Sequence, residues 1–199
     1  GRDFRASLEG TNYPVISHET GQWCAYPNFA EMDQYAGVLK PRNYEIFRES
    51  LREHGMLEQA GDFVRASGEF QVACYKQEIE ALLRTPGMGG FQLLDLHDYP
   101  GQGTAVVGPL NVFWQSKGYV TADEFRRFCD VTVPLVRMDR LVYTTADDLK
   151  AAFEIAHFGE APLEDVTPYF EIIDSEGQAV MKADLSTMTI PLGTAIPIR

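Results

Sequence analysis

The sequence predicts an α/β fold followed by part of an Ig-like β-sandwich, and three observations support this prediction. Two short apolar runs, at residues 13–18 and 91–96, each end in a polar segment with a His, a carboxylate and a nearby Gly. Three amphipathic stripes of helical spacing separate the two runs, as the crossover between parallel strands requires. After residue 134 the stripes stop and apolar residues alternate with polar ones, which is typical of short strands.

The first apolar run carries the strongest functional signal. Val15 and Ile16 are β-branched and suit a strand that is buried on both faces. His18 and Glu19 follow at its C-terminal end, where chemistry gathers in parallel α/β folds. Trp23 comes shortly after, and an aromatic face beside a carboxylate suits a sugar ring. The alternative is that Glu19 pairs with a nearby Arg and that Trp23 belongs to the core.

The segment between the two runs predicts three helices. They are expected over residues 42–54, 56–67 and 72–84, with Gly55 ending the first helix and Gly68 ending the second. Because parallel neighbours need a crossover of this kind, we expect residues 13–18 and 91–96 to be adjacent parallel strands.

The second apolar run also ends in polar residues. His97 and Asp98 follow it directly, and a second strand end of the same composition strengthens the case for a site. The alternative for Asp98 is loop capping, which Asp performs often. Gly101 and Gly103 do not make a phosphate loop, because the further Gly and the Lys of the nucleotide fingerprints are missing.

The rest of the chain predicts one more helix and then a β-rich domain. Thr121 and Glu124 have the spacing of a capping box that opens a helix reaching Cys129. Strands are expected at residues 141–144, 153–157, 169–173, 179–183 and 187–190. An Ig-like sandwich needs about seven strands. We therefore predict two domains, residues 1–134 and an incomplete sandwich at residues 135–199.

The composition of the chain limits the classes of partner that it can bind. The net charge is -12 and no run of Lys or Arg occurs, which argues against a nucleic-acid partner. No apolar segment approaches the roughly 20 residues of a membrane-spanning helix. The three Cys and four His are dispersed, which favours buried free thiols and no metal site.

The two strand ends resemble those of the family-two glycoside hydrolases, the β-galactosidase group, and are most similar to its Bacteroides-type members. The two motifs that carry the similarity are residues 16–23 and 90–103. The resemblance as a whole extends over nearly the whole chain. It implies that residues 1–134 form the C-terminal segment of a TIM-type (β/α) barrel, with the two runs as its seventh and eighth strands. Residues 135–199 would then belong to the Ig-like domain that follows the barrel.

The resemblance also implies an activity, the hydrolysis of O-glycosidic bonds in glycans. Retaining glycosidases use two carboxylates, one as nucleophile and one as acid/base. By position, Glu19 takes the nucleophile role, and His18, Trp23, His97 and Asp98 are the implied substrate contacts. No metal or organic cofactor is implied. The acid/base of the family belongs to an Asn-Glu pair that the sequence lacks, so we expect a C-terminal fragment that is inactive by itself.

Three further expectations accompany the resemblance. Family members suggest a periplasmic or secreted location. A second copy of the chain, rearranged helices, or both are expected to cover the exposed barrel strands. Thr20 stands where the family commonly has an aromatic residue, and His97 stands near where it has a Trp, so the sugar and its linkage stay open. The alternative function is a non-catalytic carbohydrate-binding or structural module, in which Glu19 only anchors the strand end.

Overall fold

The structure, a computed structural model, describes residues 2–38, 40–99 and 106–198. The chain divides into two compact units. Unit 1 consists of residues 1–16, 80–90 and 128–199, and unit 2 consists of residues 17–79 and 91–127. The domain boundary at residue 134 stays a prediction from composition. Gly101 and Gly103 lie outside the described residues.

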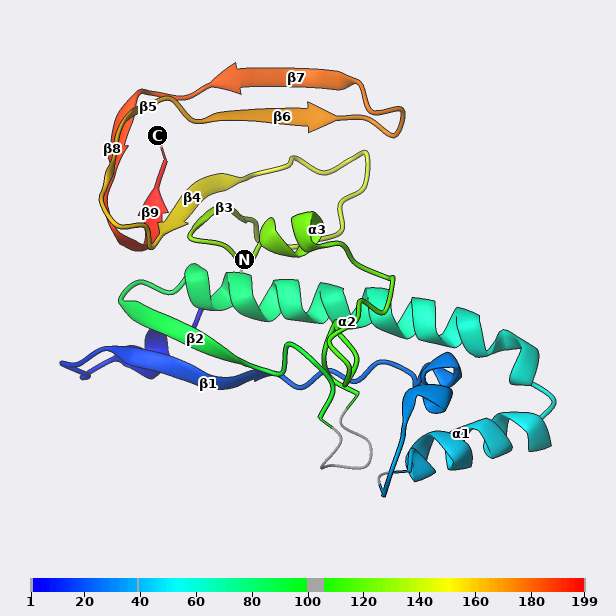
Figure 1. Ribbon diagram of the computed structural model, residues 1–199. Helices are drawn as coiled ribbons and strands as arrows, with labels where there is room; N and C mark the ends of the chain where they lie inside the picture. Colours follow the sequence, from blue (N-terminus) through cyan, green and yellow to red (C-terminus); the bar gives the residue numbers. More distant parts are fainter. Residues whose placement is uncertain (1, 39, 100–105, 199) are drawn as a thin grey trace. The chain divides into compact units, whose positions relative to one another are not determined.

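The two predicted strands are β1 (Val15–Gly21) and β2 (Met88–Leu94), and they pair with each other. Gly89 packs against Val15, and the Gln22 amide donates to the Leu94 carbonyl at 2.9 Å. This ascending register makes the strands parallel, as Figure 1 also shows. The expected helical connection is present, and its elements are η2 (Phe29–Gln34), α1 (Arg42–Glu53), η3 (Leu57–Gln59) and α2 (Ala60–Leu83).

The predicted fold class, a TIM-type barrel segment followed by a partial Ig-like sandwich, is wrong. In the described residues, β1 and β2 form a sheet of only two strands with no barrel closure, and the other strands form three small antiparallel sheets. A barrel strand is covered on both faces, whereas the Ile16 side chain in β1 is 55% exposed. A short β-branched run indicates a strand, but it does not say how many neighbours that strand has.

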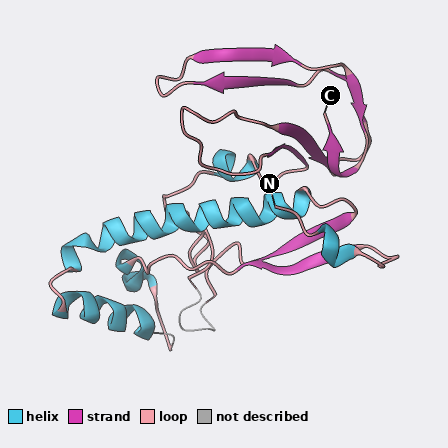
Figure 2. Cartoon of the chain, turned by 180° about the vertical axis from the view of Figure 1, so that it is seen from behind, coloured by secondary structure: helices cyan, strands magenta, loops and turns pink. Residues whose placement is uncertain are grey.

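The second and third predicted helices are one continuous helix, α2, which both views place alongside the β1–β2 pair (Figures 1 and 2). Gly68 lies inside it and does not end it. A Cβ at Gly68 would lie 2.2 Å from the ring of Tyr119, so this glycine permits close packing. The Ser67 hydroxyl donates to the Phe63 carbonyl at 2.5 Å and is thereby satisfied within the helix.

The strands of unit 1 confirm most of the predicted positions. β3 (Thr132–Arg137), β4 (Ala152–His157) and β9 (Gly193–Pro197) form one sheet, β5 (Leu163–Val166) pairs with β8 (Met188–Ile190), and β6 (Tyr169–Ile173) pairs with β7 (Ala179–Asp184). The strand predicted at residues 141–144 is absent, because these residues form an exposed loop. The unit also contains a short 3-10 helix, η1 (Arg5–Leu8).

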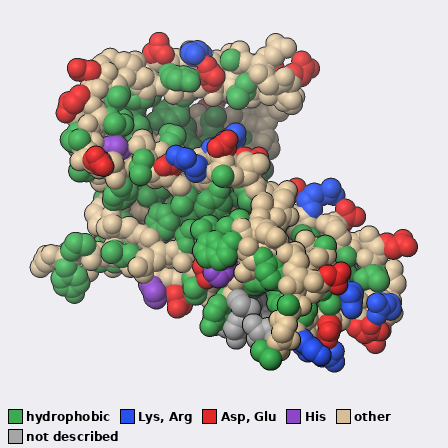
Figure 3. All heavy atoms as spheres, in the orientation of Figure 1, with side chains coloured by type: hydrophobic (Ala, Val, Ile, Leu, Met, Phe, Trp, Pro, Cys, Tyr) green, Lys and Arg blue, Asp and Glu red, His purple; other side chains and the backbone are tan. Residues whose placement is uncertain are grey.

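The β6–β7 hairpin has Phe170 on one face and an ion pair on the other. Phe170 stacks on Phe153 of β4, with ring centroids 4.8 Å apart, while Lys182 and Glu171 form an ion pair across the hairpin. Met181, which pairs with Ile172, is 51% exposed. Figure 3 accordingly shows hydrophobic side chains around a hollow beneath this hairpin.

Candidate functional site

The candidate site lies in unit 2, at the C-terminal ends of β1 and β2. The backbone at the end of β1 is unusual. Glu19 and Gln22 have left-handed φ values of 56° and 54°, and Gly21 between them has φ 113°. This conformation costs an L-residue with a side chain about 1–2 kcal/mol, and such strain occurs preferentially at functional sites.

Glu19 presents its carboxylate at this strand end, and its side chain is 53% exposed. The side-chain amide of Gln22 donates from Nε2 to Glu19 Oε2 at 3.1 Å. This neutral donor orients the Glu19 carboxylate. The His18 Nε2 atom lies 3.8 Å from Glu19 Oε1, and its Nδ1 lies 2.8 Å from Gln92 Oε1 on the neighbouring strand. Glu19 therefore keeps lone pairs open toward solvent, while the residues beside it limit its orientation.

A buried tyrosine holds the turn behind Glu19. A Cβ at Gly21 would lie 2.3 Å from Tyr75 Cε1, so only glycine fits between this ring and the strand. The Tyr75 hydroxyl lies 2.7 Å from the Val107 carbonyl and 3.0 Å from the Asp95 carbonyl. Burial raises the pKa of Tyr75, so its hydroxyl stays protonated as a donor.

Trp23, predicted to contact substrate, lies at the surface and is 43% exposed. Its indole Nε1 donates to Glu78 Oε2 at 3.0 Å, and its carbonyl accepts from the buried Gln71 side chain. The ring is thus tied to α2 at its polar edge. One part of its surface stays open for a ligand.

His97, the other predicted aromatic contact, packs against Trp114. The two ring centroids are 4.4 Å apart at an interplanar angle of 60°, and His97 Nδ1 lies 2.6 Å from the Asp98 carbonyl. Trp114 is 61% exposed and has a left-handed φ of 63°. Trp114 was not predicted as a site residue, because its exposure is a property of the folded chain.

Asp98 is placed differently from the other predicted residues. Its Oδ1 accepts from Lys117 Nζ at 2.6 Å and from the Gly108 amide at 3.0 Å. The side chains of Asp98 and Lys117 are only 3% and 2% exposed. A direct contact between Asp98 and substrate stays a prediction, and the observed contacts anchor the loops that follow β2.

A second buried carboxyl, Glu31 on η2, completes this polar cluster. Burial raises the pKa of Glu31; the Asp98 charge raises it further, whereas Lys117 and the hydrogen bonds of Asn111 and Tyr44 lower it. Glu31 Oε2 and Asp98 Oδ2 have no hydrogen-bond partner in the described residues. Neither Glu31 nor Lys117 is distinguished in the sequence from the many charged residues that face solvent.

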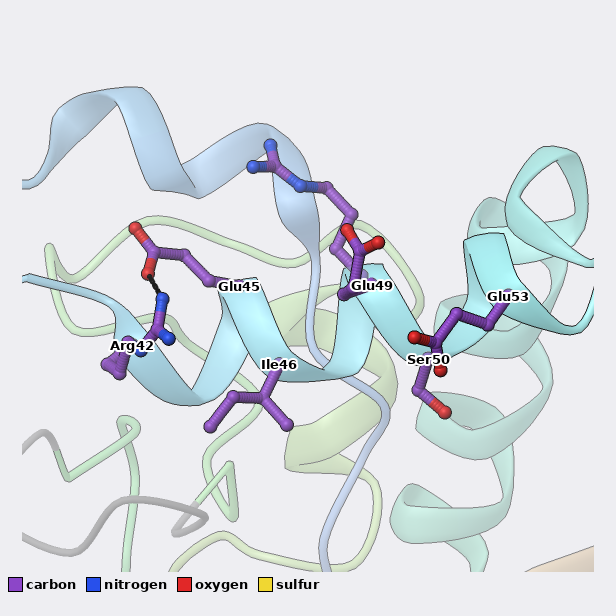
Figure 4. A pocket seen from close by; sticks show the side chains of 7 residues that line it. Arg42, Glu45, Ile46, Glu49, Ser50 and Glu53 are labelled. Atoms are coloured by element: carbon purple, nitrogen blue, oxygen red, sulfur yellow. Dashed lines mark hydrogen bonds and ion pairs between the residues drawn. The ribbon is translucent and has the colours of Figure 1, made fainter.

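A separate hollow follows the exposed face of α1 (Figure 4) and has a volume of about 540 Å³. Two of its acidic side chains are paired, Glu45 with Arg42 and Glu49 with Arg52. Such i,i+3 pairs are typical of a solvated helix face. This hollow is therefore not part of the candidate site.

The described residues show two further properties. No helix among them is long and apolar enough to cross a membrane, and no group of three or more His, Cys, Asp or Glu side chains could hold a metal ion. The three cysteines, all within the described residues, form no disulfide bond; Cys24 is exposed, and Cys74 and Cys129 are partly buried.

The comparisons with known proteins bear on unit 1 only. Residues 147–199, about a quarter of the chain, match a family model described as a domain of unknown function, DUF8488. This match does not include Glu19, His97 or any other residue of the candidate site. A search of curated proteins finds no match to the sequence.

Proposed function

We propose that this chain carries the nucleophile of a retaining β-glycosidase, and that Glu19 is that nucleophile. The observation that carries the proposal is the conformation of Glu19 near the C-terminal end of β1. Glu19 sits exposed in a left-handed backbone conformation, and a neutral Gln22 donor orients its carboxylate. The resemblance of residues 16–23 to family-two glycoside hydrolases supports the same role.

In the proposed reaction, a Glu19 oxygen attacks the anomeric carbon while the bond to the leaving oxygen breaks. A general acid protonates that oxygen, and a covalent glycosyl-enzyme forms. Water then attacks the same carbon, gives up its proton to the conjugate base and releases Glu19. The sequence has no Asn-Glu pair, so the proposal requires the acid/base to come from another part of the protein or a partner.

The substrate contacts that we propose are His18, Trp23, His97 and Trp114. Trp23 and Trp114 offer exposed aromatic faces for the apolar side of a sugar ring. His18 lies beside the nucleophile and can bond a sugar hydroxyl through Nε2. A glycan is therefore the proposed substrate class.

The test is covalent trapping in the protein that carries this chain. A panel of 2-deoxy-2-fluoro-glycosyl fluorides of gluco, galacto and manno configuration is incubated with the wild type, Glu19→Gln and the control Glu69→Gln. Mass spectrometry is expected to find a label on Glu19 in the wild type and control and none in Glu19→Gln. Turnover of natural glycans by Glu19→Gln should fall by several orders of magnitude. Activity of Glu19→Gln within about tenfold of the wild type would remove Glu19 as the nucleophile.

A second candidate function is glycan binding without catalysis. The two exposed tryptophans favour it, because neither ring needs a nearby carboxylate to stack on a sugar. Under this alternative, Trp114→Ala weakens glycan binding, Glu19→Gln leaves it unchanged, and no member of the fluorosugar panel labels the protein.

A further inference from the structure

A buried cluster of hydrogen bonds in unit 2 joins Glu31 to the loop that carries Trp114. This loop, residues 111–117, lies between β2 and α3 (Ala122–Arg126) and is called the Trp114 loop below. The Trp114 ring is 61% exposed and packs against His97. Because so much of the ring faces solvent, its position depends on the backbone of the loop.

Asn111 organises the Trp114 loop. Its Oδ1 accepts hydrogen bonds from the Phe113 and Gln115 amides at 2.9 and 3.0 Å, and its carbonyl accepts from the Trp114 amide at 3.0 Å. Its Nδ2 donates to Gln115 Oε1 at 3.0 Å. Asn111 is itself buried. The loop is thus built around this one side chain, and a displacement of Asn111 displaces the backbone of Trp114.

Glu31 on η2 contacts the loop from below its surface. Its carboxyl group hydrogen-bonds the side chains of Asn111 and Tyr44. Glu31 is only 3% exposed, and its Oε2 has no hydrogen-bond partner within residues 2–38, 40–99 and 106–198. A buried oxygen without a partner is far more costly when it carries charge. The protonated form of Glu31 therefore suits these surroundings, and the ionised form requires a further donor.

Lys117 is the cation that acts on Glu31. Burial raises the pKa of Glu31, and the charge of Lys117 opposes this effect. The Lys117 Nζ atom is bonded to Asp98 Oδ1 at 2.6 Å. Asn111 and Lys117 are the first and last residues of the Trp114 loop. An ionised Glu31 therefore attracts both ends of the loop, and it competes with Asp98 for Lys117.

Other titratable side chains also face Glu31, Lys117 or Trp114. They are Cys24, Tyr35, Tyr44, His97, Asp98 and Tyr119. Burial raises the pKa of all three tyrosines, so they stay protonated near neutral pH. An effect of Glu31 on the Trp114 loop must therefore be separated from the protonation of Asp98 and His97.

We propose that Glu31 is a positioning residue for Trp114 and that its proton controls the conformation of the Trp114 loop. With Glu31 neutral, Lys117 stays on Asp98 and Trp114 stays against His97. When Glu31 gives up its proton to solvent, the carboxylate draws in both ends of the loop, and the Trp114 ring moves away from His97. This control does not depend on catalysis at β1; only its consequence for glycan binding rests on the proposed function.

The test is fluorine-19 NMR of the full chain labelled with 5-fluorotryptophan. The chain has two Trp, so Trp23→Phe assigns both signals. Because carboxyl and imidazole groups titrate between about pH 4 and 8, the signals are followed over that range. The Trp114 signal is expected to show a step with a midpoint above pH 4.5, since burial raises the pKa of Glu31 above this value.

Four variants separate Glu31 from its neighbours. Glu31→Gln should abolish the step, whereas Glu69→Gln, at an exposed position on α2, should keep it. His97→Phe keeps an aromatic ring beside Trp114 and removes the imidazole, and the step should survive. Tyr44→Phe removes a hydrogen bond that lowers the pKa of Glu31, so the midpoint should move to higher pH. A purely structural role of Glu31 would not move this midpoint.

Two results overturn the proposal directly. One is a step of the Trp114 signal that persists in a folded Glu31→Gln. The other is a Trp114 signal without a step in a folded His97→Phe, because the wild-type step would then belong to the imidazole. If Glu31→Gln does not fold, an unchanged midpoint in Tyr44→Phe overturns the proposal.

Discussion

Lys117 Nζ lies 2.6 Å from Asp98 Oδ1, and both side chains are almost completely buried. The pair joins the residue that follows His97 to the loop that follows Trp114, and so it holds the two aromatic rings of the candidate site in contact. Burial raises the pKa of Asp98 and lowers the pKa of Lys117, since water solvates both charges better than the interior does.

Removing one charge of this pair should destabilise the fold more than removing both charges. Lys117→Met leaves the Asp98 carboxylate buried without its cation, and we expect the free energy of unfolding to fall by about 3–5 kcal/mol. The double variant Asp98→Leu/Lys117→Met should lose less than Lys117→Met alone. Urea denaturation measures both. As a control, Lys182→Met removes an exposed pair with Glu171 and should cost less than about 1 kcal/mol; equal losses at the two lysines would contradict the argument.

Glu31 should make stability depend on pH with a definite sign. Burial raises its pKa in the folded state above the ordinary value of 4.5. As the pH rises from that value through the raised pKa, the unfolded chain ionises first. The free energy of unfolding therefore falls, by about 1.4 kcal/mol for each unit of pKa difference.

Glu31→Gln keeps the shape of the side chain and removes this titration. The stability of Glu31→Gln relative to the wild type should rise with pH across the same window and then level off. The exposed Glu69→Gln serves as the control, and its stability curve should run parallel to that of the wild type. A difference between Glu31→Gln and the wild type that does not change with pH would show that Glu31 titrates alike in both states.

Two glycines of α2 should respond in opposite ways to the same substitution. Gly68→Ala places a methyl group where the Tyr119 ring lies, and that ring is held by hydrogen bonds of its hydroxyl to Gln71 and to the Gly108 carbonyl. We expect a loss of about 1–3 kcal/mol. Gly61→Ala meets no atom within 4 Å and should gain up to about 1 kcal/mol from helix propensity. Thermal unfolding of the two variants decides this, and a neutral Gly68→Ala would mean that the ring can move.

The strained backbone at Glu19 should separate stability from activity. Glu19→Gly and Glu19→Ala both lack the carboxylate, but only glycine relieves the left-handed φ, so Glu19→Gly should be more stable than Glu19→Ala by about 1 kcal/mol. At His18, where φ is not left-handed, the order of Gly and Ala should be reversed. Melting temperatures test this order.

The same Glu19→Gly variant tests the chemistry. Azide occupies the vacated space and attacks the anomeric carbon, so it should restore part of the turnover and yield a glycosyl azide. It should not change the activity of Gln22→Gly, which keeps Glu19. Failure of azide to produce any glycosyl azide, in a folded variant that binds glycan, would count against a nucleophilic Glu19.

Local patterns in the sequence were sufficient for the elements whose stability is local. The stripe of Tyr44 and Leu51 predicted α1, and both side chains are buried in it. Thr121 and Glu124 form the predicted capping box, although α3 ends at Arg126 and does not reach Cys129. The β6–β7 hairpin appears where alternation and a turn predicted it. In each case the interacting residues are close together in the chain.

Features that depend on contacts between residues far apart in the chain could be seen only in the tertiary structure. The Tyr119 ring packs on Gly68 within the continuous helix α2, and Lys117 pairs with the buried Asp98. The number of strands beside β1 is likewise a long-range property, so the same β-branched run that suits a barrel occurs here in a two-stranded sheet. By itself, the sequence determined the approximate positions of α1, β1, β2 and the β6–β7 hairpin, and that Glu19 lies in the C-terminal part of β1. Which side chains meet was decided only by folding, because burial and pairing are properties of the packed chain.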